Sequence, residues 1–196
     1  MMNSDSILRS LPAKVIPVIE KTTQEYQDVM ASCKTLFEKK TRDYGTAWRI
    51  LRLPSITDQI FIKAQRIRSI QEKGKQRVDD PIKDEFIGII NYCIIALVQM
   101  QLHESASLEM TFEELEPLYD AASKETLDLL QNKNHDYGEA WREMRVTSMT
   151  DIILMKLLRV KQIEDNQGKT LASEGVKANY QDMINYAVFA LIKLED

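Results

Sequence analysis

Two positively charged side chains stand three residues apart in the first half of the chain, and the same pattern recurs in the second half. Lys63 and Arg66 form the first pair, and Lys156 and Arg159 form the second. Residues three apart on a helix project from the same side, and cations near the start of a helix suit a phosphate group. The pattern predicts phosphate-binding or nucleotide-binding sites. With a further repeated arginine, the predicted binding residues are Arg49, Lys63, Arg66, Arg142, Lys156 and Arg159.

Acidic residues accompany these cations. Carboxylate oxygens are ligands of Mg²⁺, which often bridges to substrate phosphates. Asp182 has no acidic counterpart in the first half, where Gly88 stands, so a metal site that uses Asp182 would be asymmetric. Magnesium is the predicted cofactor, and its predicted ligands are Asp43, Asp58, Asp136, Asp151 and Asp182.

The same residues also have structural explanations. Asp58 and Asp151 follow Ser55 and Ser148 by three residues, which is close to a capping box, and an acid in the first turn stabilises a helix by about 0.3 to 1 kcal/mol. Asp43 and its counterpart in the second half could close turns through backbone hydrogen bonds. The cation pairs could be solvated, or they could be paired with the two capping acids, Asp58 and Asp151. The residue types leave both interpretations open.

Other polar and aromatic residues carry weaker functional signals. Asn91 and Asn185 lie within nearly continuous apolar stretches, where a side-chain amide must find a partner, and we expect hydrogen bonds between helices. Tyr44 and Trp48 are expected mainly in the core, with base stacking as the alternative. The sequence has no Gly-rich phosphate loop, no HExxH and no nucleophilic triad, so whether the protein is an enzyme stays open.

All the predicted cations lie in a stretch that is written twice. Residues 43–70 and 136–163 agree at half of their positions without a gap, and many of the identical residues are polar. Self-similarity of this kind indicates an internal duplication. A duplicated core would need only its hydrophobicity, so the polar identities indicate a role beyond packing.

The first helix of each half has a recognisable start. In the first half we expect it to begin after Thr22 or Thr23 and to end near Arg42, behind a proline-containing arm that is irregular or packs on the outside. In the second half, Thr111 opens a capping box that predicts a helix start. Pro117 should break or restart that helix.

Two further helices follow in each half. Gly45 is expected to end the first helix in a left-handed conformation. Ser55 and Ser148 are expected to cap the second helices. The third helices, which begin near Glu85 and Tyr180, are the most apolar and should be the most buried.

These elements predict an all-α fold, because no segment shows sustained two-residue alternation. We expect a tandem duplication of a three-helix module that forms a pseudo-twofold helical bundle. The predicted divisions are an N-terminal arm (1–21), a first helical repeat (22–105) and a second helical repeat (106–196).

Composition narrows the class of partner. Charged residues make up 29% of the chain and the net charge is -4, so net charge does not support a nucleic-acid partner. The longest apolar run is too short for a membrane span, and the N-terminus lacks the pattern of a secretory signal. We expect a cytoplasmic protein with no membrane partner, and a homo-oligomer is compatible with the sequence.

The motifs resemble a bacterial and phage family of helical proteins, the nucleotide-modification-associated domain, whose function is unassigned. They read KxxDYGxAW from Lys40, SxTDxIxxKxxR from Ser55 and INYxxxAL around Asn91, and they recur from Lys133 onward. The resemblance covers nearly the whole chain after residue 22. The family's label comes from the company that such domains keep, and it names no reaction.

The layout is also similar, more weakly, to the all-α nucleotide pyrophosphohydrolases of the MazG-like and dimeric dUTPase group. Those proteins hold magnesium with Glu-x-x-Glu and Glu-x-x-Asp pairs. The nearest counterparts here depart from that pattern: Glu25 with Asp28, Glu85 with Gly88, and Asp182 with Asn185. The likeness implies kinship of fold without the four-acid mechanism.

Two functions follow as hypotheses. The first is binding of a nucleotide or another phosphorylated small molecule, with magnesium-assisted nucleoside-phosphate chemistry if the protein is an enzyme. The alternative is a non-catalytic helical interaction module associated with nucleic-acid processing. Convergence of Lys63 and Arg66 on a cleft with Asp43 or Asp58 would favour the first hypothesis, and their dispersal over open surface would oppose it.

Overall fold

The described chain is helical throughout. A computed structural model describes residues 16–74, 81–102, 106–170 and 174–195, without the side chains of 16–20 and 135–137. Within these ranges there is no strand, so the predicted all-α class is confirmed. The elements are α2 (Ile16–Tyr44), η1 (Ala47–Ile50), α3 (Leu53–Lys73), α4 (Ile82–Gln101), α5 (Phe112–Tyr137), η2 (Ala140–Glu143), α6 (Val146–Asp165) and α7 (Val176–Glu195).

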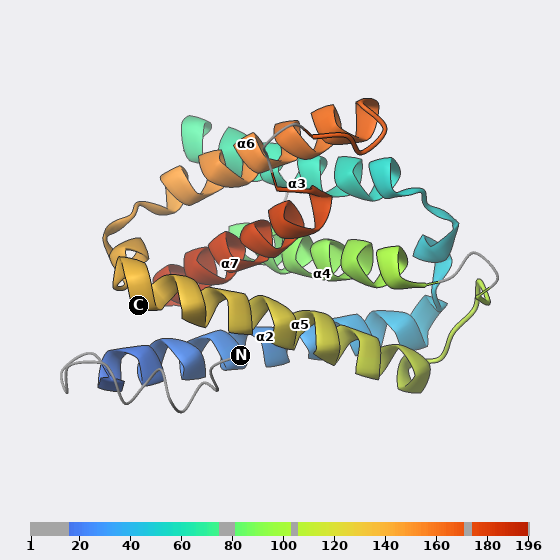
Figure 1. Ribbon diagram of the computed structural model, residues 1–196, viewed down its shortest axis with the longest axis horizontal. Helices are drawn as coiled ribbons and strands as arrows, with labels where there is room; N and C mark the ends of the chain where they lie inside the picture. The colour runs from blue at the N-terminus through green and yellow to red at the C-terminus, as the bar shows by residue number, and fades with distance from the viewer. Residues whose placement is uncertain (1–15, 75–80, 103–105, 171–173, 196) are drawn as a thin grey trace.

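The long helices form three layers, and each layer contains one helix from each half (Figure 1). Helices α3 and α6 pack together in one outer layer, α4 and α7 form the middle layer, and α2 and α5 form the other outer layer. In each half, a short 3-10 helix connects the first long helix to the second: η1 connects α2 to α3, and η2 connects α5 to α6. The predicted three-helix module, used twice, is confirmed.

Equivalent ion pairs mark the pseudo-twofold relation between α3 and α6. Lys161 lies 2.6 Å from Asp58, and Arg68 lies 3.6 Å from Asp151. In the duplicated stretch, Lys161 corresponds to Arg68 and Asp151 to Asp58. Each half therefore presents the same acid and the same cation position to the other.

The middle layer is the core. Helices α4 and α7 contain the longest series of buried side chains, including Phe86, Ile90, Met183 and Ile184, because they are covered by both outer layers. This explains why their sequences are apolar on nearly every side. Among the described helices, none is long and apolar enough to cross a membrane.

Helix α2 is longer than its sequence predicts. It begins at Ile16 rather than after Thr22 or Thr23, and it therefore enters the segment that we expected to be irregular. Pro17 lies in the first turn, where a missing N–H group costs no intrahelical hydrogen bond. At the other end Gly45 has a φ of 68°, which confirms the left-handed termination.

The predicted serine caps of the second helices are wrong. Helix α3 begins at Leu53 after Arg52, and α6 begins at Val146 after Arg145, without side-chain caps. In α3, Pro54 lies in the first turn, where its fixed φ favours a helix start. The serines therefore lie inside the helices, and the acids that follow them lie beyond the first turn.

Helix α5 starts as predicted and continues where a break was expected. The Thr111 hydroxyl accepts a hydrogen bond from the backbone N–H of Glu114, and the Glu114 carboxylate accepts one from Thr111 N–H at 2.7 Å. Pro117 lies within the continuous helix. It removes only the hydrogen bond to the carbonyl of Glu113, near an exposed helix end that water can reach.

Candidate functional site

A cavity of about 730 Å³ opens in the first half between α2, η1, α3 and α4. This volume lies within the range of small-molecule sites. Its wall combines aromatic, amide and charged side chains. The described lining residues are Leu36, Phe37, Lys40, Thr41, Tyr44, Gly45, Ala47, Trp48, Leu51, Gln59, Lys63, Asp84, Glu85, Gly88, Asn91, Tyr92 and Ile95.

The predicted cation pair of α3 converges on one acid at this cavity. Lys63 Nζ lies 3.2 Å from Glu85 Oε2, and Arg66 pairs with the other oxygen of the same carboxylate. Glu85 belongs to α4 and is only 8% exposed. The two cations share a face of α3, as their spacing predicts, but their common partner is Glu85 rather than Asp43 or Asp58.

A glycine gives Lys63 its position. A Cβ atom on Gly88 would lie 2.7 Å from both Cδ and Cε of Lys63, so the lysine chain runs directly over Gly88. Lys40 of α2 lines the same cavity and has no ion pair within the described part of the chain. Two lysines from different helices therefore border one space.

The wall also contains three aromatic side chains with polar atoms: Tyr44, Trp48 and Tyr92. Tyr44 is 64% exposed at the rim. Burial, followed by the charges of Tyr92 and Asp43, raises the pKa of Tyr44 above its usual value, so the phenol is neutral at physiological pH. Aromatic faces beside cations can hold a flat ring and an anion together.

The second half fills the equivalent region with its own side chains. Lys133 lies 2.7 Å from Asp182 Oδ1, and Lys156 pairs with Oδ2. Burial would raise the pKa of Asp182, but the hydrogen bonds and charges of the two lysines outweigh burial and hold that pKa below its usual value. Trp141 stacks on Phe189 with ring centroids 4.2 Å apart and is 5% exposed.

The two predicted arginines of the 3-10 helices serve the fold. Arg49 is buried, donates to the carbonyl oxygens of Ala106 and Ser107 at 3.3 Å, and also contacts Gln99. It thereby holds η1 against the connection between the two halves. Neither Arg49 nor its counterpart Arg142 lines the cavity.

Arg142 joins the two halves. Its guanidinium group lies 2.6 Å from Glu25 and 2.5 Å from Glu139, and it stacks over the Trp141 ring at 4.4 Å. Glu25 belongs to α2 of the first half. The duplicated arginines therefore anchor the 3-10 helices in both halves through different partners.

The structure does not bring the predicted metal ligands together. Asp43 is exposed, and Asp58 and Asp151 form the ion pairs between α3 and α6. Asp182 is held by lysines, and the side chain of Asp136 lies outside the described residues. Across the described ranges, no three His, Cys, Asp or Glu side chains are grouped so that they could hold a metal ion.

Sequence reasoning missed Lys40 and Glu85. The repetition of Lys40 as Lys133, at the start of the shared motif, was the available signal for the lysine. Repetition gave no signal for Glu85, because Asn179 stands at the equivalent position of α7, and the likeness to the nucleotide pyrophosphohydrolases placed Glu85 only opposite a metal-binding acid. Its role depends on how α4 packs against α3.

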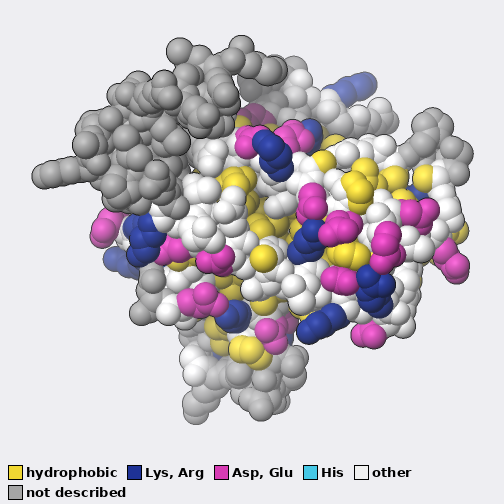
Figure 2. All heavy atoms as spheres, turned by 90° about the horizontal axis from the view of Figure 1, so that it is seen from below, with side chains coloured by type: hydrophobic (Ala, Val, Ile, Leu, Met, Phe, Trp, Pro, Cys, Tyr) yellow, Lys and Arg dark blue, Asp and Glu magenta, His cyan; other side chains and the backbone are white. Residues whose placement is uncertain are grey.

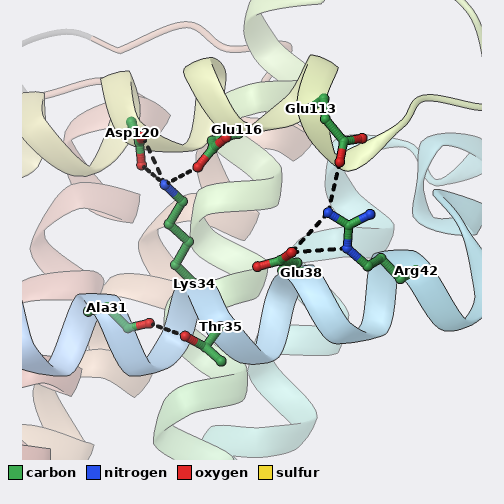
Figure 3. A network of polar contacts seen from close by, with 8 residues as sticks. All are labelled: Ala31, Lys34, Thr35, Glu38, Arg42, Glu113, Glu116 and Asp120. Atoms are coloured by element: carbon green, nitrogen blue, oxygen red, sulfur yellow. Dashed lines mark hydrogen bonds and ion pairs between the residues drawn. The ribbon is translucent and has the colours of Figure 1, made fainter.

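Charges of both signs cover the face formed by α2 and α5. Figure 2 shows Lys and Arg side chains interspersed with Asp and Glu over this face. Figure 3 shows Lys34 reaching Asp120 and Glu116 across the two helices, and Arg42 reaching Glu113. The described residues of this face do not form a one-sign surface for nucleic acid (Figure 2). Within this outer layer, the contacts instead fasten α2 of the first half to α5 of the second.

The fold and its two equivalent halves define an all-α tandem-repeat protein. The sequence profile of the family described as "Nucleotide modification associated domain 1" matches residues 40–100 and again 133–194, together more than half of the chain. The chain belongs to this family and contains the domain twice. No curated protein and no solved structure matches the chain significantly.

Proposed function

We propose that the protein binds a nucleotide or another phosphorylated small molecule in the cavity of the first half. The observation that supports this most is the pairing of Lys40 and Lys63 with the aromatic side chains of Tyr44, Trp48 and Tyr92 around one cavity of about 730 Å³. A phosphate would contact the lysines, and a base would lie against the aromatic side. The family's description is compatible with such a ligand.

Glu85 positions one cation at the cavity. It pairs with Lys63 and Arg66, and of these two Lys63 lines the cavity. Asp84 lines the same cavity, so its carboxylate would face a magnesium ion that arrives with a polyphosphate. If the protein is an enzyme, magnesium-assisted nucleoside-phosphate chemistry is the class that we propose.

An interaction module remains the second candidate because of exposed apolar side chains. Ile62 of α3 is 59% exposed, and its counterpart Met155 of α6 is 49% exposed, beside Leu158 at 56%. Such side chains on the α3 and α6 layer suit a protein partner.

We also propose a cytoplasmic location. Cys33 and Cys93 are free and buried, which is compatible with that location.

A thermal-shift panel of nucleoside mono-, di- and triphosphates, with and without magnesium, tests the proposal. A ligand at a hundred times its dissociation constant stabilises the folded state by about 2.7 kcal/mol, which is readily measured. We expect at least one nucleotide to raise the melting temperature. The absence of a shift across the panel would overturn the proposal, and product analysis of positive samples would detect turnover.

Substitution of the cavity lysines should weaken binding of that nucleotide. We expect Lys40→Ala and Lys63→Ala each to cost about 1.5 to 3 kcal/mol of binding free energy, because each removes a charge-assisted contact to phosphate. Isothermal titration calorimetry measures the change. Lys39→Ala is the matched control, because Lys39 neighbours Lys40, is exposed and does not line the cavity. Equal effects of Lys39→Ala and Lys40→Ala would contradict this site.

A further inference from the structure

Each half has an acid on its third helix, and the two acids lie on different turns of the equivalent helices α4 and α7. Alignment of Asn91-Tyr92 with Asn185-Tyr186 sets Gly88 opposite Asp182 and Glu85 opposite Asn179. The acid of α4 therefore lies one turn earlier than the acid of α7. The lysines that face these turns are duplicated in both halves.

In the second half, the acid lies between the two duplicated lysines. Lys133 comes from α5 and Lys156 from α6, and both contact the Asp182 carboxylate of α7. Asp182 is 8% exposed and the Lys156 side chain is 12% exposed, whereas the Lys133 side chain is 39% exposed, so this anion site is enclosed on the Lys156 side and open on the Lys133 side. Its occupant is part of the protein itself.

In the first half, the corresponding place holds no carboxylate of its own. Gly88 has no side chain, and Glu85 lies one turn away, where it pairs with Lys63 and Arg66. Lys40, the counterpart of Lys133, has no ion pair among the described residues and lines the cavity together with Lys63 and Gly88. This shift of the acid leaves the lysine of α2 available to a ligand.

We infer that the Asp182 carboxylate occupies, in the second half, the anion subsite that the first half keeps for a ligand. The subsite lies in the cavity that Lys40, Lys63 and Gly88 line, where Lys63 crosses Gly88 to reach Glu85, and it takes a single anionic group, a phosphate or a carboxylate. This inference rests on the proposed function and makes it more specific. It gives one ligand per chain, bound in the first half, although the binding motif is written twice.

Exchange of the two residues tests the inference. Gly88→Asp gives the first half the carboxylate of the second, and Lys63 can move aside because the atoms that a new Cβ would meet belong to its flexible end. Gly88→Asn is the control of equal size without the charge. Asp182→Gly empties the subsite of the second half, and Asp182→Ala does so while favouring the helix more.

Inorganic phosphate is the probe, and acetate is titrated in parallel. Phosphorus NMR and calorimetry together give the affinity and the stoichiometry of phosphate binding. We expect one phosphate site in the wild type. Binding should be weakened by at least about tenfold in Gly88→Asp and less in Gly88→Asn, because the aspartate occupies the lysines and repels the anion. In Asp182→Gly and Asp182→Ala a second site should appear, and phosphate should raise their melting temperatures more than that of the wild type.

The outcomes separate the two proposals. If the wild type binds phosphate and Gly88→Asp binds it equally well, the subsite assignment is overturned while ligand binding stands. Equal losses in Gly88→Asp and Gly88→Asn would also overturn it, because the effect would then be one of size. Failure of both folded Asp182 variants to gain a site would overturn the role of Asp182. If neither nucleotides nor phosphate bind the wild type, the proposed function itself fails. Stronger binding of acetate than of phosphate would leave the subsite assignment standing and overturn the phosphorylated ligand of the proposed function.

Discussion

At the scale of single residues, the two halves differ at one position of their second helices. Glu164 of α6 is an acid, and the equivalent residue of α3 is an amide, Gln71. Thr57 donates to Glu164 Oε1 at 2.8 Å, and the Tyr180 hydroxyl donates to the same oxygen at 3.4 Å. Gln71, at the equivalent position of α3, donates to Thr150 at 3.0 Å. Burial raises the pKa of Glu164, and these hydrogen bonds only partly oppose the increase.

We expect Glu164→Gln to stabilise the protein near neutral pH. A carboxyl group whose pKa is raised on folding contributes most stability below its unfolded pKa, about 4.3, and loses it as pH rises through the folded pKa. Glutamine keeps the acceptor oxygen and carries no charge. The gain should be about 0.5 kcal/mol, since the side chain is partly exposed, and should vanish at acidic pH.

Urea denaturation at neutral and acidic pH measures this difference. Gln71→Glu is the reciprocal control and should introduce the corresponding penalty at neutral pH. A Glu164→Gln protein that is less stable than the wild type at neutral pH would contradict the expectation.

At the scale of helices, tyrosines of the outer layer bond to asparagines of the middle layer in the other half. The Tyr119 hydroxyl of α5 donates to Asn91 Oδ1 of α4 at 3.0 Å, and the Tyr26 hydroxyl of α2 donates to Asn185 Oδ1 of α7 at 3.0 Å. Asn91 also donates to the carbonyl of Cys33 at 3.0 Å. The predicted interhelical role of both asparagines is confirmed.

Removal of one such hydroxyl should destabilise the whole bundle. We expect Tyr119→Phe and Tyr26→Phe each to lower the free energy of unfolding by about 1 to 2 kcal/mol, because a buried amide oxygen loses its donor. Chemical denaturation measures the loss. Tyr92→Phe is the control, since Tyr92 is only half-buried and lies beside the cavity. Unchanged stability of both hydroxyl variants would contradict the assigned bonds.

The sequence predicted the helices and the shared face of Lys63 and Arg66, but not their partner. Periodicity predicts which side chains share one face of a helix. The burial of the middle layer could also be predicted, because α4 and α7 are apolar on nearly every side. Periodicity also shows why Asp58 is not the partner of Lys63, since residues five apart on a helix are about 140° apart around its axis. Glu85 could not be predicted, because its contact depends on the register between α3 and α4. The starts of α2 and α3 were missed where prolines mark the first turn, and the start of α6 was missed because its predicted serine cap lies inside the helix.

At the scale of the whole molecule, the halves share one core. Every layer contains a helix from each half, and buried side chains of both halves form one continuous cluster. We expect a single cooperative unfolding transition rather than separate melting of two domains. The sequence could predict the duplication, but not this interleaving, because local patterns do not specify which layers pair.

The two tryptophans provide one reporter for each half. Trp48 lies in η1 and Trp141 in η2, so Trp141→Phe leaves a reporter of the first half and Trp48→Phe leaves one of the second. Fluorescence-detected urea transitions of each variant should coincide with its own loss of helical circular dichroism. A helical signal that persists after either reporter has unfolded would contradict a shared core.

The crossed Tyr26–Asn185 and Tyr119–Asn91 bonds have the form of an isologous dimer interface, in which each partner gives and receives the same contact. A gene for a single half would encode a protein that completes these bonds only by pairing with its own copy. In such a pair every substitution appears twice, so both pockets must stay alike. Fusion of the two copies into one reading frame removes that constraint. A glycine can then be kept at position 88 while position 182 carries an acid, and one half can specialise in holding the molecule together.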